Sequence, residues 1–247
     1  MGPKKLKTIG ILGGMGPEAT AHFFGLVVKN TRAAKDQDHV PVIVYNLPAI
    51  PDRTAAILRG GASPLPHLVR GVRALHRAGA DFAVIPCVTA HYFHPALAAR
   101  SSIPVVQLLE ETVADVRKRR PRIRVIGLLA SDGTVVSRIF HDAFGAAGIE
   151  VLVPTPHDQK RVMNAIYGKK GIKAGVTTGL PRKAVLDAAA GLIRAGAQGI
   201  VAGCTEVPLV LGEDDLPVPL VEPMRIGARA CITKAGGRTR AIGRPGR

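Results

Sequence analysis

An internal repeat constrains the fold of this chain more than any other feature of its sequence. Three segments of the first half recur in the second: GADFAVIPC at 79–87 as GAQGIVAGC at 196–204, IGIL at 9–12 as IGLL at 126–129, and IPVV at 103–106 as VPLV at 218–221. The first two pairs lie 117 positions apart and the third 115. Three matches in one order at nearly one offset indicate two structurally similar halves.

Each half alternates between strand and helix patterns. A short apolar run ends in a turn that opens an amphipathic helix, at residues 17–31 and again at 134–148. A later helix ends at Gly79 or Gly196, which are natural helix C-caps, and the apolar strand after it ends at a cysteine. Apolar strands alternating with helices predict an α/β fold of mainly parallel sheets flanked by helices. Further strands are expected at 42–48, 105–111, 149–155 and 218–222.

The repeat predicts two pseudo-symmetric domains with the active site in the cleft between them. We expect the first α/β domain to comprise residues 1–104 plus 216–233 and the second to comprise residues 105–215. Residues 234–247, KAGGRTRAIGRPGR, are basic, rich in glycine and without apolar periodicity, so a disordered tail is expected there.

Charge and cysteine usage narrow the classes of function. The formal net charge is +16, a field that attracts anionic ligands and binds nucleic acid nonspecifically. No helix-turn-helix, zinc-ligand or aromatic ribonucleoprotein motif supports specific nucleic-acid binding, and the histidines show no metal-ligand spacing. Three cysteines do not suggest a disulfide framework, and no stretch approaches the ~20 apolar residues of a membrane span. A cytoplasmic location is expected, and no membrane partner.

Cys87 and Cys204 occupy equivalent strand ends in the two halves, where parallel sheets bind ligands. Inverting the stereocentre of an amino acid needs a base on one face of Cα and an acid on the other. Two thiols suit both directions if their pKa falls from ~8.5 toward neutrality, and a helix starting after each cysteine would favour the thiolate. Two buried, inert thiols are the alternative. Cys231 has no counterpart in the repeat and is assigned to packing.

Several motifs together resemble the aspartate/glutamate racemase family, most closely its aspartate racemase branch. They are GILGGMGPEAT (10–20), IPDRT (50–54), ADF…PC.TAH (80–91), EET (110–112), DGT..S (132–137) and AGCTE (202–206). The resemblance runs from about Ile9 to about Ile232. It implies a pseudo-symmetric two-domain fold and an isomerase that needs no pyridoxal phosphate, other cofactor or metal. It further implies two catalytic cysteines, which fall on Cys87 and Cys204, and a homodimer.

The resemblance also implies contacts to a small amino-acid substrate. They fall on Asp52, Arg53, Thr54, Val88, Thr89, Ala90, Thr134, Lys173 and Thr205. Arg53 and Lys173 also suit an acidic amino acid on chemical grounds, because arginine binds carboxylates in a bidentate fork. A surface salt bridge and a solvated loop charge are the alternatives for these two. His91 and Glu206 are candidates for orienting the thiols, or for capping and core roles.

Val88 departs from the family pattern. The family usually has asparagine directly after the first cysteine, so a polar contact beside the substrate is lost here. A different amino-acid substrate, or another reaction on the same fold such as a maleate-type isomerisation, is therefore kept as an alternative. A non-catalytic or nucleic-acid-binding relative, and a dinucleotide-binding enzyme using the turn from Gly14 to Ala19, are the remaining alternatives.

Overall fold

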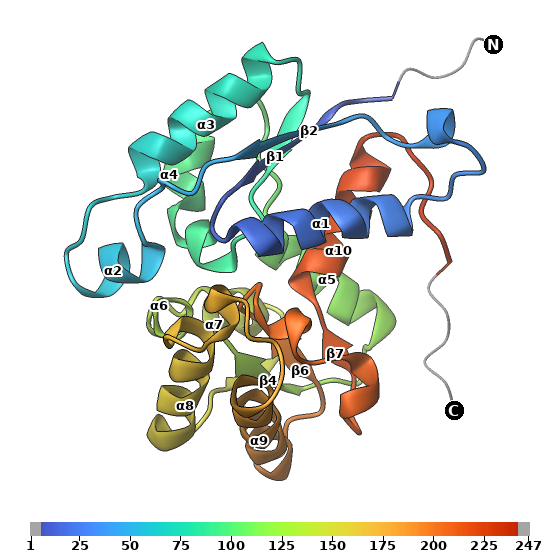
Figure 1. Cartoon of the computed structure of the whole chain (residues 1–247). Coiled ribbons are helices and arrows are strands. Elements are labelled where there is room, and N and C mark those ends of the chain that lie inside the picture. Colours follow the sequence, from blue (N-terminus) through green and yellow to red (C-terminus); the bar gives the residue numbers. More distant parts are fainter. Residues whose placement is uncertain (1–5, 242–247) are drawn as a thin grey trace.

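The computed structural model describes residues 6–241 and shows two lobes, one above the other in Figure 1. The upper lobe and its connection contain β1 (Ile9–Gly13), α1 (Pro17–Asn30), η1 (Asp36–Asp38), β2 (Val42–Asn46), α2 (Arg53–Leu58), α3 (Leu65–Arg77), β3 (Phe82–Val84), η2 (Val88–Phe93), α4 (His94–Ala98) and α5 (Leu108–Arg119). The lower lobe contains β4 (Val125–Leu129), α6 (Asp132–Val136), α7 (Ile139–Gly145), β5 (Glu150–Leu152), α8 (Pro156–Tyr167), η3 (Ile172–Ala174), α9 (Leu180–Arg194), β6 (Ile200–Ala202), η4 (Val207–Leu209), η5 (Glu213–Asp215) and β7 (Leu220–Val221). Helix α10 (Pro223–Lys234) then returns to the upper lobe.

Both sheets are parallel. The first has the order β2-β1-β3 and the second the order β5-β4-β6-β7, so β5-β4-β6 corresponds to β2-β1-β3 and β7 is an additional strand. An isolated parallel bridge joins Ala83 to Val105 in the first half, where β6 and β7 pair Ile200 with Leu220 in the second. The offsets of 117 and 115 seen in the sequence are therefore those of equivalent strand pairs. The α/β prediction is confirmed.

Side chains alternate between the two faces of each sheet, as strand geometry requires. In β1, Ile9 and Ile11 pack with α1 and α10, whereas Leu12 packs with the residues of α3. In β6, Ile200 contributes to the cluster beneath α8 and α9, whereas Val201 faces the cluster that includes α5 and α7 residues. Helices on both faces explain why these strands read as continuous apolar runs.

The glycines predicted to end α3 and α9 both adopt positive φ, +99° at Gly79 and +104° at Gly196. In each case the glycine N–H and the next residue's N–H donate to carbonyls of the last helical turn, as in a Schellman motif. The two turns lead directly into β3 and β6, so the caps set where each cysteine-bearing strand begins.

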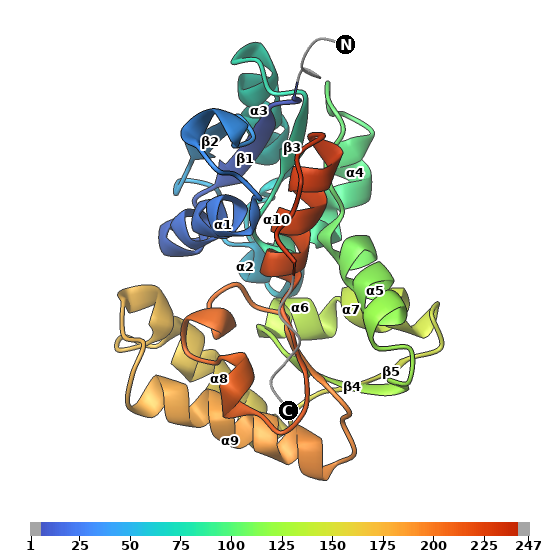
Figure 2. The same ribbon diagram turned by 90° about the vertical axis from the view of Figure 1, so that its right-hand side faces the viewer.

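The region from 216 to 233 is divided between the lobes. Its strand β7 pairs with β6 in the second sheet, whereas α10 packs on α1 in the first lobe (Figure 2). This differs from the expectation that residues 216–233 all join the first domain. The chain returns to that lobe only after Val221, because β7 repeats the edge position that residues 103–106 occupy in the first half.

Residues 234–241 are ordered, contrary to the disordered tail expected from Lys234. Arg240 N–H donates to Asn30 O at 2.8 Å, Arg32 N–H donates to Arg238 O at 2.7 Å, and Thr239 bridges to Thr31. Composition alone does not show that this segment pairs with the end of α1. The rest of the predicted tail, 242–247, lies outside the described residues.

Two local predictions also differ from the structure. Residues 105–111 were expected to form a strand, but only Val105 is bridged and α5 begins at Leu108. The helix expected over 134–148 is split into α6 and α7, because Arg138 adopts a left-handed conformation, φ +56°. Across residues 6–241, the helices are all too short or too polar to cross a lipid bilayer.

A glycine in β1 allows α3 to approach the sheet closely. A Cβ at Gly10 would lie 2.9 Å from Ala80 Cβ and 3.2 Å from Phe82 O, groups that cannot rotate away. We predict that Gly10→Ala lowers the free energy of unfolding by about 1–3 kcal/mol. Gly25→Ala, within α1 and with open space around it, is the matched control and should raise stability by up to about 1 kcal/mol. Urea titration measures both; equal midpoints would contradict the close-approach argument.

Candidate active site

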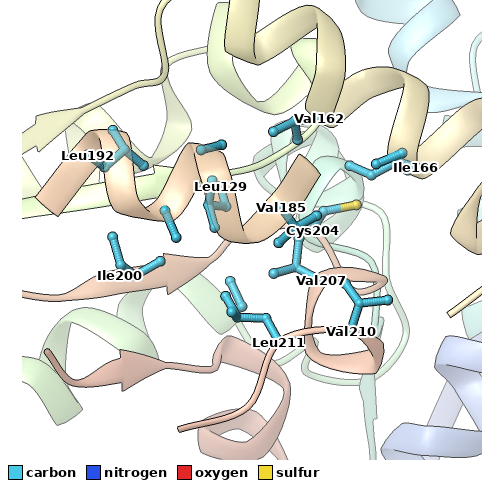
Figure 3. Close-up of a cluster of buried hydrophobic side chains, with 14 of the residues drawn as sticks. Leu129, Val162, Ile166, Val185, Leu192, Ile200, Cys204, Val207, Val210 and Leu211 are labelled. Atoms are coloured by element: carbon cyan, nitrogen blue, oxygen red, sulfur yellow. The ribbon is translucent and has the colours of Figure 1, made fainter. Parts of the chain in front are cut away.

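The two cysteines lie where the sequence predicts, just beyond the carboxyl ends of β3 and β6. Cys87 is 4% exposed and Cys204 is 7% exposed, and neither is disulfide-bonded. Cys204 forms one end of the apolar cluster drawn in Figure 3, beside Val185 and Val207. Both cysteines line a single narrow cavity between the lobes, so the structure brings the two thiols to one site.

The narrow cavity opens beside a wider one of about 280 Å³. The two share Met15, Arg53, Tyr167, Lys173 and Glu206 as lining residues. The inner cavity has only about 10 Å³, room for roughly one water molecule. A ligand can therefore enter through the wider cavity, but it must displace side chains to place an atom between the thiols.

Cys204 lies in a short chain of polar contacts. Its thiol donates to Glu206 Oε2 at 2.9 Å, and Thr205 Oγ1 donates to the same oxygen at 3.1 Å. The other carboxylate oxygen accepts from Lys173 Nζ at 2.5 Å. Burial raises the pKa of the Cys204 thiol well above its ordinary value, Glu206 raises it further, and Lys173 acts in the opposite direction. These surroundings favour the protonated form of the Cys204 thiol, so its pKa is raised rather than lowered toward neutrality as the sequence predicts.

Lys173 lies on η3 and faces two acidic groups, the Glu206 carboxylate and the Cys204 thiol. Burial alone would lower the pKa of this amine, but the Glu206 carboxylate, with a smaller effect from Cys204, outweighs burial and raises the pKa. Its Nζ also lies 5.4 Å from the centroid of the Tyr167 ring. Burial raises the pKa of Tyr167 to about 12, so its phenol stays a neutral hydrogen-bonding group.

Cys87 lies beside a cation. The buried Arg53 guanidinium donates to the carbonyl oxygens of Pro51 at 3.2 Å and Met15 at 3.3 Å. Burial lowers the pKa of Arg53, but the nearby acidic groups, first Cys87 and then Tyr167 and Asp52, outweigh burial and raise it. Among the described residues its buried Nε has no hydrogen-bond partner, which leaves a donor for a ligand.

Hydroxyl groups join the lobes around this cavity. Thr89 and Thr134 lie 2.8 Å apart, and Thr54 lies 3.4 Å from the Tyr167 hydroxyl. A Cβ at Gly133 would lie 2.7 Å from Thr54 Oγ1, so α2 and α6 meet through a glycine. These contacts fix α2, which carries Arg53, against the second lobe.

Most of the predicted site residues come together, but not all. The inner cavity is lined by Arg53, Cys87, Val88, Thr89, Lys173, Cys204 and Thr205. Thr54 and Thr134 support that wall, and exposed Asp52 lines only the wider cavity while its side chain caps α2 by accepting from Ala55 N–H at 2.7 Å. Ala90 lines neither cavity and is buried in the apolar cluster of the first lobe.

His91 has a structural place. It is buried, its Nε2 lies 3.2 Å from Ile85 O, and its ring stacks on His94. Burial, helped by His94, lowers the pKa of His91 to about 4, so the ring is neutral at pH 7. Of the two helpers expected from the sequence, Glu206 contacts a thiol and His91 supports the turn after β3.

Two further residues that line both cavities, Tyr167 and Met15, were not predicted from the sequence. Tyr167 lies six residues before Lys173 in the segment that carries the lysine, and this was the signal available. Met15 belongs to the glycine turn considered for dinucleotide binding. That turn is held by Thr20, which accepts from Gly14 N–H and donates to Gly16 O, and it lines the wider cavity. Over residues 6–241, no three His, Cys, Asp or Glu side chains are grouped to hold a metal ion.

Comparison with known proteins agrees with this geometry. The family described as Asp/Glu/Hydantoin racemase matches residues 12–231. A broad specificity amino-acid racemase, RacX of Bacillus subtilis (strain 168), is 26% identical over 92% of this chain and 95% of its own length. The structure of an aspartate racemase of Picrophilus torridus superposes with a TM-score of 0.85, at 28% identity over 95% of this chain and 96% of that chain. The glutamate racemase of Francisella tularensis shares the fold, with a TM-score of 0.64 at 16% identity over 93% of this chain and 81% of that chain.

Two α/β lobes with a thiol from each at a shared cavity define the class of fold and site. The chain belongs to the Asp/Glu/Hydantoin racemase family, and it is an isomerase of the racemase class.

The buried neutral His91 makes stability depend on pH. Unfolded His91 binds a proton below about 6.5, whereas the folded form does so only near 4, so stability is lost as pH falls from 6.5 to 4. The pKa difference corresponds to a loss on the order of 3 kcal/mol. We predict that His91→Gln flattens this part of the curve of unfolding free energy against pH. An unchanged slope in the variant would contradict the buried, neutral assignment.

Proposed function

We propose that the protein is an amino-acid racemase that uses no cofactor and acts through Cys87 and Cys204. The observation that carries the proposal is the presence of both thiols at one buried cavity, each delivered by the equivalent strand of its own lobe. One thiolate removes the Cα proton while the other thiol protonates the opposite face, which inverts the stereocentre. The roles exchange in the reverse reaction, because the thiol that gave its proton is then the thiolate.

The substrate is an acidic amino acid of the aspartate type. Arg53 and Lys173 are cations at the junction of the two cavities, and Arg53 keeps an unpartnered donor. A dicarboxylic amino acid supplies two anionic groups for these cations, and the hydroxyls of Thr89 and Thr205 lie on the cavity wall for the remaining polar groups. The aspartate racemase of Picrophilus torridus is the structural relative that supports this substrate class.

Val88 favours a second candidate, a racemase of other or several amino acids on the same site. Its side chain is 2% exposed and packs among the apolar residues that line the core of the second lobe, so it offers no hydrogen bond to a ligand. RacX of Bacillus subtilis, a relative over nearly the whole chain, is described as having broad specificity. Selection of the side chain then rests on Arg53 and Lys173 alone.

Hydrogen exchange at Cα tests the proposal and the substrate together. The purified protein, with no cofactor added, is incubated in heavy water with L- and D-aspartate, glutamate and a panel of other amino acids. Deuterium incorporation with loss of optical rotation, abolished by thiol alkylation, is the expected result, strongest with aspartate. Exchange with none of them would refute racemisation and favour a maleate-type isomerisation, which is assayed next on the same sample.

Each thiol is required for inversion. We predict that Cys87→Ser and Cys204→Ser each lower kcat for racemisation at least about 1,000-fold in both directions, because one face of Cα loses its proton carrier. Cys231→Ser is the matched control, since that thiol is fully buried against α1 and carries no proton in the mechanism. Normal racemisation by either active-site variant would refute the two-thiol mechanism.

Restoring the family's asparagine tests the role of Val88. We predict that Val88→Asn shifts the ratio of kcat/KM between aspartate and neutral amino acids toward aspartate. The variant also buries an amide in an apolar cluster, so the free energy of unfolding should fall by about 1–3 kcal/mol. Kinetics over the same panel, with a urea titration, separate the two effects; identical kcat/KM ratios would show that Val88 does not affect selectivity.

A homodimer, which the family resemblance implies, and a cytoplasmic location, which suits three unbridged cysteines, belong to the same proposal. Sedimentation equilibrium of the purified chain tests the dimer.

A further inference from the structure

The repeat that places the two cysteines is broken beside them. The offset of 117 positions pairs Cys87 with Cys204 but pairs Thr89 with Glu206. One thiol is therefore followed by a hydroxyl and the other by a carboxylate, although both follow equivalent strands. The asymmetry bears directly on proton transfer, because a neighbouring anion favours the protonated form of a thiol and a neighbouring cation favours the thiolate.

Glu206 is held tightly against Cys204. It is 4% exposed, and the Cys204 thiol and the Thr205 hydroxyl both donate to Oε2 while Lys173 binds Oε1. A buried carboxylate needs such partners, and these three hydrogen bonds satisfy both of its oxygens. The position of the Glu206 side chain is thus fixed: Oε2 accepts from the thiol and the Thr205 hydroxyl, and Oε1 accepts from the amine.

Cys87 has the opposite surroundings. Thr89, the counterpart of Glu206, is turned to Thr134 at 2.8 Å and to Ser131 at 3.3 Å, across the boundary between the lobes. Arg53 lines the inner cavity beside Cys87, and Cys87 raises the pKa of this guanidinium. Cys87 therefore lies near a cation, whereas Cys204 donates directly to an anion.

We propose that Glu206 is a positioning residue that holds Cys204 as the protonated thiol in the empty site, so that Cys87 is the base and Cys204 the acid for the first substrate bound. The inference rests on the proposed function for its catalytic meaning. It adds that the two thiols, although equivalent in the repeat, are not equivalent at the start of turnover. The first substrate to react is the enantiomer whose Cα proton faces Cys87.

The proton balance of that first turnover follows from these positions. Cys87 Sγ takes the Cα proton and becomes a thiol, while Cys204 Sγ gives its proton to the opposite face of Cα and becomes a thiolate. Glu206 neither takes nor gives a proton in this step. Lys173 then lies beside both the Glu206 carboxylate and the new thiolate and offsets part of their negative charge, which makes the second protonation state accessible.

Other charged groups around Cys204 must be counted. Lys173 approaches from η3, Tyr167 from the end of α8, Arg53 and Asp52 from the start of α2, and Glu18 lines the wider cavity from α1. None of these groups has a hydrogen bond to the Cys204 thiol among the described contacts, whereas Glu206 does. Removal of its charge is therefore expected to act on Cys204 more than removal of any other.

Alkylation by iodoacetamide tests the inference. Peptide mass spectrometry measures the alkylation rate of each cysteine as a function of pH, in the absence of substrate. The rate tracks the thiolate fraction. Glu206→Gln should lower the midpoint for Cys204 by about one pH unit or more and leave the midpoint for Cys87 in place, whereas Lys173→Met should raise the Cys204 midpoint.

Glu206→Asp keeps the charge and should restore much of the wild-type midpoint. Glu18→Gln, which removes the same charge from the cavity mouth, is the matched control and should leave Cys204 unchanged.

An unmoved Cys204 midpoint in Glu206→Gln would overturn the inference. Fully buried Cys231 reports unfolding in every sample. If Glu206→Gln exposes Cys231, the Lys173→Met result decides instead, and an unchanged or lowered midpoint there overturns the inference. Because alkylation needs no substrate, a shifted midpoint without racemisation of any amino acid would refute the proposed function alone, and racemisation with an unshifted midpoint would refute this inference alone.

Discussion

A parallel strand delivers the residue that follows it to the carboxyl edge of its sheet, and the site depends on this constraint being met twice. Cys87 follows β3 and Cys204 follows β6, each beside the central strand of its own sheet. The two edges face one another because α5 and α10 pack together and carry the chain between the lobes. Glycine C-caps at equivalent positions start both strands at equivalent points, so the placement of the thiols follows from backbone geometry before any polar contact is made.

Duplication explains where the thiols lie, and the residues that differ between the halves explain what each can do. Burial raises the pKa of the Cys204 thiol, Glu206 reinforces this effect and Lys173 limits it, whereas Cys87 shares the lining of the inner cavity with Arg53. The same cations suit a substrate with two carboxylates, so one set of charges serves substrate binding and the protonation of the thiols.

The repeat and the motifs predicted the two-lobe α/β fold, the caps at Gly79 and Gly196, and most of the lining of the inner cavity. These features depend on local chemistry, namely apolar strands, glycine turns and residues next to the cysteines. The misassigned parts depend on distant partners. Residues 234–241 are ordered by the end of α1, β7 by its edge position on β6, and Tyr167 reaches the site only because α8 ends at the cavity. Ala90 is adjacent to the site in sequence, but its side chain packs in the core of the first lobe.

In the proposed mechanism the two thiols act on opposite faces of one Cα atom. A crystal structure of the Cys87→Ser, Cys204→Ser double variant, with the preferred amino acid bound, measures this directly. The account predicts the ligand's Cα between the two Ser Oγ atoms, within about 3–4 Å of each and on opposite faces, with its carboxylates at Arg53 and Lys173. A ligand held only in the wider cavity, or one with both hydroxyls on the same face of Cα, would contradict it.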